Sequence, residues 1–294
     1  MALRPAQSGS TVLSMMRRFS TPAIAISLVL VLAATSHSWA EAPASANAAF
    51  DTYIRTIETR IARQHASPGR FIVLPSPSSV GHGGPVIERI AVAPVPGGLL
   101  HHWRASQFLP GARAAELDRL LRDYSAYPTL FAPQVERVRA VPTTHGVDRV
   151  TMRVRQHHVI TVVLDTDYEV SFGQLDPQHR FSTSRSTGVR EIESPGTAAE
   201  HTLPPGEEHG FLWRQNTYWS YEERDGGLYV QVESVSLTRT IPTGLGWVIG
   251  PYIESIPRDS LAFTLQSICS ALQRQLSPQS SALDPQSNLE RKSQ

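Results

Sequence analysis

Histidine is the residue of this chain that most suggests chemistry, because eleven are present and imidazole is a common metal ligand. Two adjacent pairs, His101 with His102 and His157 with His158, lie in strand-like segments. Neighbouring residues on a strand point to opposite faces, so the members of a pair cannot bind one ion together. The single cysteine, Cys269, excludes multi-cysteine metal sites and disulfides within the chain. We therefore expect no metal site and no cofactor.

Covalent and acid–base catalysis also lack a recognisable motif. No Gly-x-Ser-x-Gly turn is present, and Cys269 falls near the apolar stripe of a predicted helix, which favours packing. The glycine-rich stretches 81–84 and 244–246 lack the strand-to-helix context of a phosphate loop. Paired carboxylates such as Asp165 and Asp167 fall on a polar strand face. We expect no catalytic residue.

The aromatic residues near position 215 are more informative. One predicted strand carries four of them on the same face, with Gln215 and Thr217 in between: Phe211, Trp213, Trp219 and Tyr221. Such a stripe is typical of a plain core, and also of an apolar pocket in which a few polar groups orient a ligand. In the second interpretation the candidate ligand-binding residues are Met152, Val162, Leu164, Tyr168, Trp213, Trp219, Tyr221, Glu233, Arg239 and Phe263.

Two charged residues belong to that set because of an irregular pattern. The apolar alternation in 228–241 changes face near Ser234, and a bulge there would turn Glu233 or Arg239 inward. An arginine that faces inward needs a carboxylate, such as Glu233 or an acidic group of the ligand, to offset its burial.

The elements that must position these residues follow from periodicity. Apolar positions recur with helical spacing in 47–64, 112–124 and 257–276. The second helix is expected to end at Tyr127–Pro128, because a residue before proline avoids the α region; Ser255 is the expected N-cap of the third. Beyond 276 the tail is polar and predicted to be disordered. A period of two predicts strands over 86–92, 99–108, 135–141, 147–156, 159–172, 180–191, 211–224 and 228–241.

Composition narrows the class of protein. The 294 residues carry 27 basic and 26 acidic side chains, and a net charge of +1 gives no reason to propose a nucleic-acid partner. Residues 41–85 are predicted to form a helix and a Pro/Gly-rich linker before a domain over 86–276, with the tail at 277–294.

Residues 1–40 are typical of a secretory signal peptide. Arg17 and Arg18 precede an uninterrupted low-polarity run at 23–34, and small residues at Ser38 and Ala40 suit a cleavage site. The run is shorter than the ~20 apolar residues that a membrane span needs. We expect cleavage after Ala40, export to the periplasm or the medium, and no membrane span in the product; an uncleaved anchor is the alternative.

The order of elements, an α+β layout, resembles the helix-grip fold of the START, polyketide cyclase and birch-allergen-like superfamily. Three stretches carry the resemblance: LLRDYSAYPTLF at 120–131, YWSY at 218–221 and YVQVESVSLTR at 229–239. The resemblance implies a curved antiparallel sheet around a long C-terminal helix, and a cavity between them that holds a lipid, sterol, quinone or polyketide.

We therefore expect an exported, non-enzymatic module that binds a hydrophobic small molecule. Two alternatives remain: an aromatase/cyclase-type enzyme that uses the same cavity, and a structural or interaction domain whose cavity is filled by its own side chains. The sequence does not determine the ligand or the oligomeric state.

Overall fold

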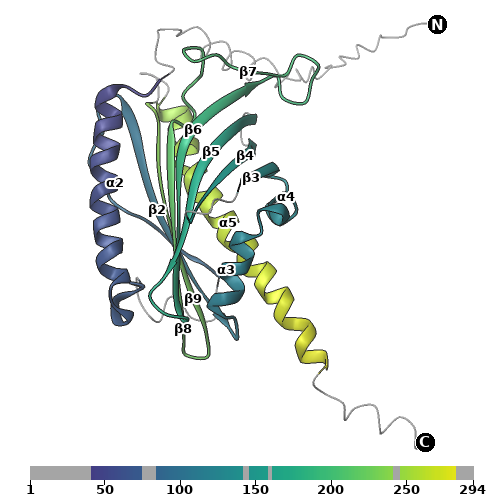
Figure 1. Ribbon diagram of the computed structural model, residues 1–294. Helices are drawn as coiled ribbons and strands as arrows, with labels where there is room; N and C mark the ends of the chain where they lie inside the picture. The colour runs from purple at the N-terminus through teal and green to yellow at the C-terminus, as the bar shows by residue number, and fades with distance from the viewer. Residues whose placement is uncertain (1–40, 75–83, 142–145, 158–160, 241–245, 283–294) are drawn as a thin grey trace, which may run out of the picture. The chain divides into compact units, whose positions relative to one another are not determined.

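The computed structural model describes residues 41–74, 84–141, 146–157, 161–240 and 246–282, with the side chains of the last helix described for 255–276. The described strands form one antiparallel sheet in the order β1-β2-β9-β8-β6-β5-β4-β3, with β7 paired to β6 (Figure 1). The strands are β1 Val86–Arg89, β2 Gly98–Pro110, β3 Val135–Val141, β4 Val147–His157, β5 Thr161–Gln174, β6 His179–Glu193, β7 His201–Thr202, β8 Arg214–Arg224 and β9 Gly227–Arg239.

The helices cover the two faces of this sheet unequally. They are α2 Ala44–His65, α3 Ala114–Arg122, α4 Tyr127–Leu130 and α5 Gly246–Ala282, with single 3-10 turns at Pro68–Arg70 and Tyr124–Ala126. Figure 1 shows α2 along one face of the sheet, which we call the outer face, and α3 and α5 along the other, which we call the inner face. The predicted α+β class and helix-grip arrangement are confirmed.

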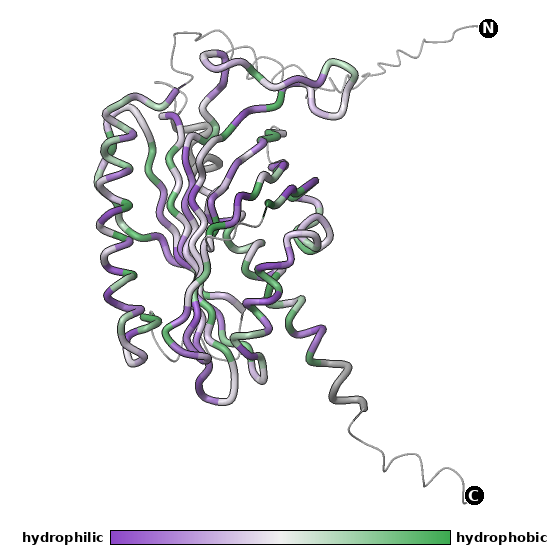
Figure 2. Tube along the Cα trace, in the orientation of Figure 1, coloured by the Kyte–Doolittle hydropathy of each residue, from purple (hydrophilic) through white to green (hydrophobic). Residues whose placement is uncertain are grey.

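Helix α2 is amphipathic, and Figure 2 shows hydrophobic and hydrophilic residues alternating along it. Its buried stripe is Phe50, Ile54, Ile57 and Ile61, at the spacing that the sequence predicts. The stripe packs on outer-face residues of three strands: Leu100, Tyr218, Val235 and Leu237. Helix α2 is therefore one layer of the fold.

Proline placement differs from the prediction in two helices. Pro128 does not stop the chain from turning helically, because it occupies the first turn of α4, where its missing N–H leaves no hydrogen bond unmade. Helix α5 begins at Gly246, so Ser255 is not its N-cap, the segment 246–251 is helical, and Pro257 lies inside the helix. Buried Leu261 and Leu265 pack on the sheet just beyond Pro257, and this packing outweighs the local cost of proline.

The end of α5 also differs, because the helix continues to Ala282 and includes the first residues of the predicted tail. Three other predictions lie outside the described residues: the signal peptide at 1–40, the glycines at 81–83 and Gly244, and the last residues from 283. Among the residues that the structure describes, no helix is both long and apolar enough to cross a membrane.

Strand β9 explains the irregular pattern near Ser234. Its pairing with β2 and with β8 is unbroken from end to end, so the predicted bulge is wrong. Leu228, Val230 and Val232 face the inner core, whereas Val235 and Leu237 face α2. The apolar residues change face because a different helix covers each half of the strand.

Candidate functional site

The inner face of the sheet is divided into an apolar zone and a polar zone. The apolar zone lies under α3 and α5, and its strand residues are Ala105, Leu109, Trp219, Tyr221, Leu228, Val230 and Val232. Leu265 and Ile268 of α5 are fully buried against it. Phe263 packs at its margin and is only partly buried.

The polar zone continues along the same strands toward the C-terminal end of β9. Its buried members on β9 are Ser234, Ser236 and Thr238, with His101 on the neighbouring β2. Strand alternation places all four on the inner face. These side chains are uncharged hydroxyl groups and an imidazole, so this part of the face is polar without a carboxylate or a guanidinium from these two strands.

Hydrogen bonds connect the polar zone across several strands. The Tyr168 hydroxyl on β5 donates to Gln215 Oε1 on β8, and Gln215 Nε2 donates to Ser234 Oγ, each at 3.3 Å. His101 Nε2 and Thr238 Oγ1 are also 3.3 Å apart. Tyr168 reaches across β6 because its partner there is the small Ser186. These contacts are longer than is usual for protein hydrogen bonds, about 2.5–3.0 Å for O–H···O and about 2.7–3.2 Å for N–H···O.

Trp103 stands where the two zones meet. It pairs with Ser234 across β2 and β9 and packs against the apolar zone. Its indole Nε1 is buried, and within the described chain this N–H has no hydrogen-bond partner. A buried donor left unpaired costs about 1–3 kcal/mol, so this N–H is available to an acceptor that enters the site.

The tyrosines of the inner face are protonated at neutral pH. Burial raises the pKa of Tyr168 to about 12. The pKa of Tyr221 is also raised, mainly by burial and also by the hydrogen bond that its hydroxyl donates to Asp118 at 2.6 Å. Both hydroxyls therefore donate hydrogen bonds rather than act as bases.

Seven of the ten candidate residues share the inner side of the sheet. Trp219, Tyr221 and Phe263 belong to the apolar zone, and Tyr168 and Met152 belong to an adjoining inner-face cluster. Val162 and Leu164 lie on the same face of β5 as Tyr168, as the predicted alternation requires.

The other three candidates lie on the outer side, so the prediction that all ten line one cavity is wrong. Trp213 precedes β8 and packs in the cluster around α2. Phe211 also precedes β8 and is exposed, so the predicted aromatic stripe reduces to Trp219 and Tyr221. Because β9 has no bulge, Glu233 and Arg239 lie on the same face as Val235 and Leu237. They therefore point away from α5.

Glu233 instead joins α2 to the sheet. Its Oε2 lies 2.5 Å from Arg60 of α2 and 2.8 Å from His102 Nε2, and its Oε1 lies 3.3 Å from Arg104. The Tyr53 hydroxyl is 2.7 Å from the other nitrogen of His102. Burial opposes ionisation of Glu233, but the hydrogen bond from His102 and the charges of Arg104 and Arg60 outweigh it and lower the pKa to about 2. His101 and His102 point to opposite faces, as predicted.

Sequence reasoning missed Trp103 and the hydroxyl residues of β9. The alternation of the strands could have indicated them, because Trp103 falls on the same face as His101, and Ser234, Ser236 and Thr238 fall on the same face as Val232. Sheet pairing was needed to recognise that these positions adjoin. Among the described residues, no group of three or more His, Cys, Asp or Glu could hold a metal ion.

Comparison with known proteins found neither a matching family model nor a matching curated protein. Similar solved structures include a STAR-related lipid transfer protein from Xanthomonas axonopodis, at 19% identity and a TM-score of 0.42, covering 65% of this chain and 94% of that one. Human STARD10 is 11% identical with a TM-score of 0.44, covering 71% and 79%. The Zhui aromatase/cyclase from Streptomyces sp. R1128 is 15% identical with a TM-score of 0.41, covering 60% and 96%.

We take the fold from the strand order and from the placement of α5 on the inner face. With an antiparallel sheet packed on a long C-terminal helix, this chain has the helix-grip arrangement that its sequence predicts.

Proposed function

We propose that the inner face beneath α5 binds a hydrophobic small molecule of the lipid, quinone or polyketide type, without chemical conversion of it. The observation that carries the proposal is the buried N–H of Trp103, which has no partner within the described chain and lies where the apolar zone meets the polar zone. A ligand with an apolar body and an uncharged oxygen acceptor matches both zones.

Each part of the proposed ligand has a matching group of residues in the site. The apolar body packs against Trp219 and Phe263, and its carbonyl or hydroxyl oxygen accepts from Trp103 Nε1. Ser234 and Gln215 adjust around that oxygen, since the hydrogen bond between them is already long at 3.3 Å. Tyrosines with raised pKa values in this face support binding rather than proton abstraction.

Native mass spectrometry and solvent extraction of the purified protein test the proposal. We expect an apolar molecule to co-purify, or an uncharged fluorescent sterol such as dehydroergosterol to bind saturably. If no apolar molecule is extracted and no uncharged apolar probe binds, the proposal is wrong. Conversion of a linear poly-β-ketone would replace it with the aromatase/cyclase alternative.

Two tryptophan variants locate the site. Trp103→Phe removes the unpaired donor, so the empty protein should be as stable as the wild type or more stable, while probe affinity falls about tenfold, the equivalent of one hydrogen bond of ~1.4 kcal/mol. Trp213→Phe is the matched control on the outer side, and its probe affinity should not change. Equal affinities in all three proteins would contradict this placement.

We also propose that the protein is exported, because residues 17–40 combine two arginines, an apolar run and small residues before Glu41, as a signal peptide does. N-terminal sequencing of the product from its native host should find Glu41 first. A membrane-associated product that retains Met1 or Met15 would contradict this.

A further inference from the structure

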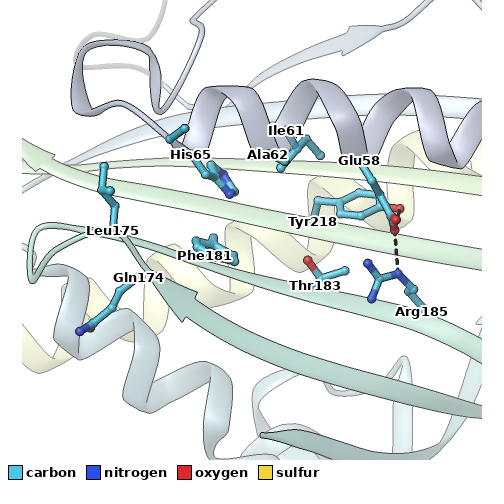
Figure 3. Close-up of a pocket in the computed structure, with 11 residues that line it drawn as sticks. Glu58, Ile61, Ala62, His65, Gln174, Leu175, Phe181, Thr183, Arg185 and Tyr218 are labelled. Carbon is cyan, nitrogen blue, oxygen red and sulfur yellow. Dashed lines mark hydrogen bonds and ion pairs between the residues drawn. The ribbon is translucent and has the colours of Figure 1, made fainter.

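A pocket lies on the outer face, between the C-terminal half of α2 and the strands that extend past it. Its volume is about 480 Å³, within the ~300–1,000 Å³ range of small-molecule sites. Figure 3 shows α2 above the pocket and strand residues below it. It is separated from the inner-face site by the sheet itself.

Small side chains create this space. Ala62 of α2 and Ala66, the residue just after the helix, lie one turn apart, and β6 presents Thr183 below them. The buried stripe of α2 packs on β2, β9 and β8. Between Glu58 and His65, which both contact residues of β6, the helix presents the small Ala62 to the pocket. Leu175 at the end of β5 is 40% exposed at the rim.

An aromatic wall lines one end of the pocket. The His65 ring stacks on Phe181 and on Phe71, each with ring centres 4.4 Å apart. Gly173 leaves room for the ring of Phe181, since a Cβ at position 173 would lie 2.2 Å from a ring atom. Burial lowers the pKa of His65 to about 4, so the imidazole is neutral at pH 7.

The charges of the pocket are balanced at the other end. Arg185 Nε donates to Glu58 Oε1 at 2.7 Å, and the Tyr218 hydroxyl donates to the same oxygen at 3.0 Å (Figure 3). With His65 neutral, the lining has one cation and one anion in contact with each other. A charged ligand would have to disrupt that pair or remain unpaired, whereas an uncharged ligand would not.

We propose that this pocket is a second binding site, for a small uncharged aromatic molecule. Its ring packs on Phe181 and His65, against the aliphatic side chains of Ile61 and Leu175. Its polar group, a hydroxyl or carbonyl, hydrogen-bonds to the hydroxyl of Thr183. The site is independent of the inner-face function, because it shares no lining residue with that face.

The test uses 2-naphthol as the probe and 2-naphthoate as its charged counterpart, titrated into the full chain by calorimetry at pH 7. We expect 2-naphthol to bind and 2-naphthoate to bind at least tenfold more weakly. Chemical shifts of the Ala62, Ala66 and Thr183 methyl groups should move with 2-naphthol. Absence of 2-naphthol binding at millimolar concentration, or equal binding of the two probes, would overturn the proposal.

Matched variants separate this pocket from the inner face. Ala62→Leu fills the pocket from an exposed helix position and should weaken 2-naphthol binding at least tenfold without unfolding the protein. Ala48→Leu makes the same change at another exposed position of α2 and should leave binding unchanged. Gly173→Ala displaces Phe181 and should also weaken binding, whereas Trp103→Phe should not. Binding that falls with Trp103→Phe but not with Ala62→Leu would place the probe on the inner face and overturn the proposal.

Discussion

A helix layer packs on each face of the sheet, and the contacts that attach the two layers differ. On the outer face, α2 combines an apolar stripe with ion pairs, of which Arg60–Glu233 is the most buried. On the inner face, the described part of α5 packs on apolar side chains. Both faces have buried polar atoms without a hydrogen-bond partner within the described chain, such as Asn216 Oδ1 on the outer face and Trp103 Nε1 on the inner face, and the Trp103 donor lies beside apolar side chains. The ion pairs of α2 thus add to apolar packing on the outer face, whereas the proposed ligand site uses the donor of Trp103 beside the apolar zone of the inner face.

The largest expected effect tests the inner face as a packed core. Leu265→Ala removes a fully buried side chain between α5 and the sheet, and it should lower the free energy of unfolding by ~2–5 kcal/mol. Urea denaturation measures this loss. Phe263→Ala is the matched variant: Phe263 is only partly buried, so its loss of stability should be smaller than its loss of probe affinity. If both variants lose equal stability and probe binding is unchanged, Phe263 belongs to the core rather than to the ligand site.

The next effect tests the electrostatic attachment of α2. Glu233→Gln removes the carboxylate that three cationic or hydrogen-bonding partners share, and it should destabilise the protein by about 3 kcal/mol, because unpaired charges remain near the protein interior. Hydrogen exchange should show faster opening of α2 than of β3 and β4. A loss below ~1 kcal/mol would mean that apolar packing alone holds α2.

Acid should weaken the outer face in two stages. The pKa of His65 is lowered from 6.5 to about 4, so its neutral form stabilises the fold above pH 6.5, and this contribution is lost as the pH falls to about 4. The pKa of Glu233 is lowered from 4.5 to about 2, so its contribution is present above pH 4.5 and is lost as the pH falls to about 2. Thermal melts from pH 7 to pH 2 should show that Glu233→Gln and wild type converge only below pH 4.5. Convergence already at pH 6 would contradict the assignment to Glu233.

The smallest effect concerns an exposed ion pair at the same interface. Asp51 of α2 contacts Arg214 at 2.8 Å, but the side chains are 47% and 31% exposed. Asp51→Asn should change stability by less than ~1 kcal/mol, because solvent screens such pairs. A loss as large as that of Glu233→Gln would show that burial is not what distinguishes the two contacts.

The sequence was sufficient for most elements and insufficient for their faces. The stripe of α2 and the alternation of β5 follow from backbone periodicity alone, and both were predicted. Glu233 and Arg239 were predicted to face the cavity, because the change of face in 228–241 was attributed to a bulge. Two helices covering opposite halves of β9 produce the same pattern without a bulge. Trp213 was included because it alternates with Trp219 and Tyr221, but it precedes the first residue of β8.

Local spacing therefore determined that this protein has amphipathic strands, an amphipathic helix at α2 and a long helix at α5, since a side chain's direction depends only on its own backbone. Tertiary structure alone decided that Glu233 meets Arg60, 173 residues away, and that Trp103 meets Ser234 between two zones of one face. It also decided that Ala62 and Thr183 leave a pocket between them. These outcomes depend on which elements cover which face, and that is fixed by the packing of the whole chain rather than by any one segment.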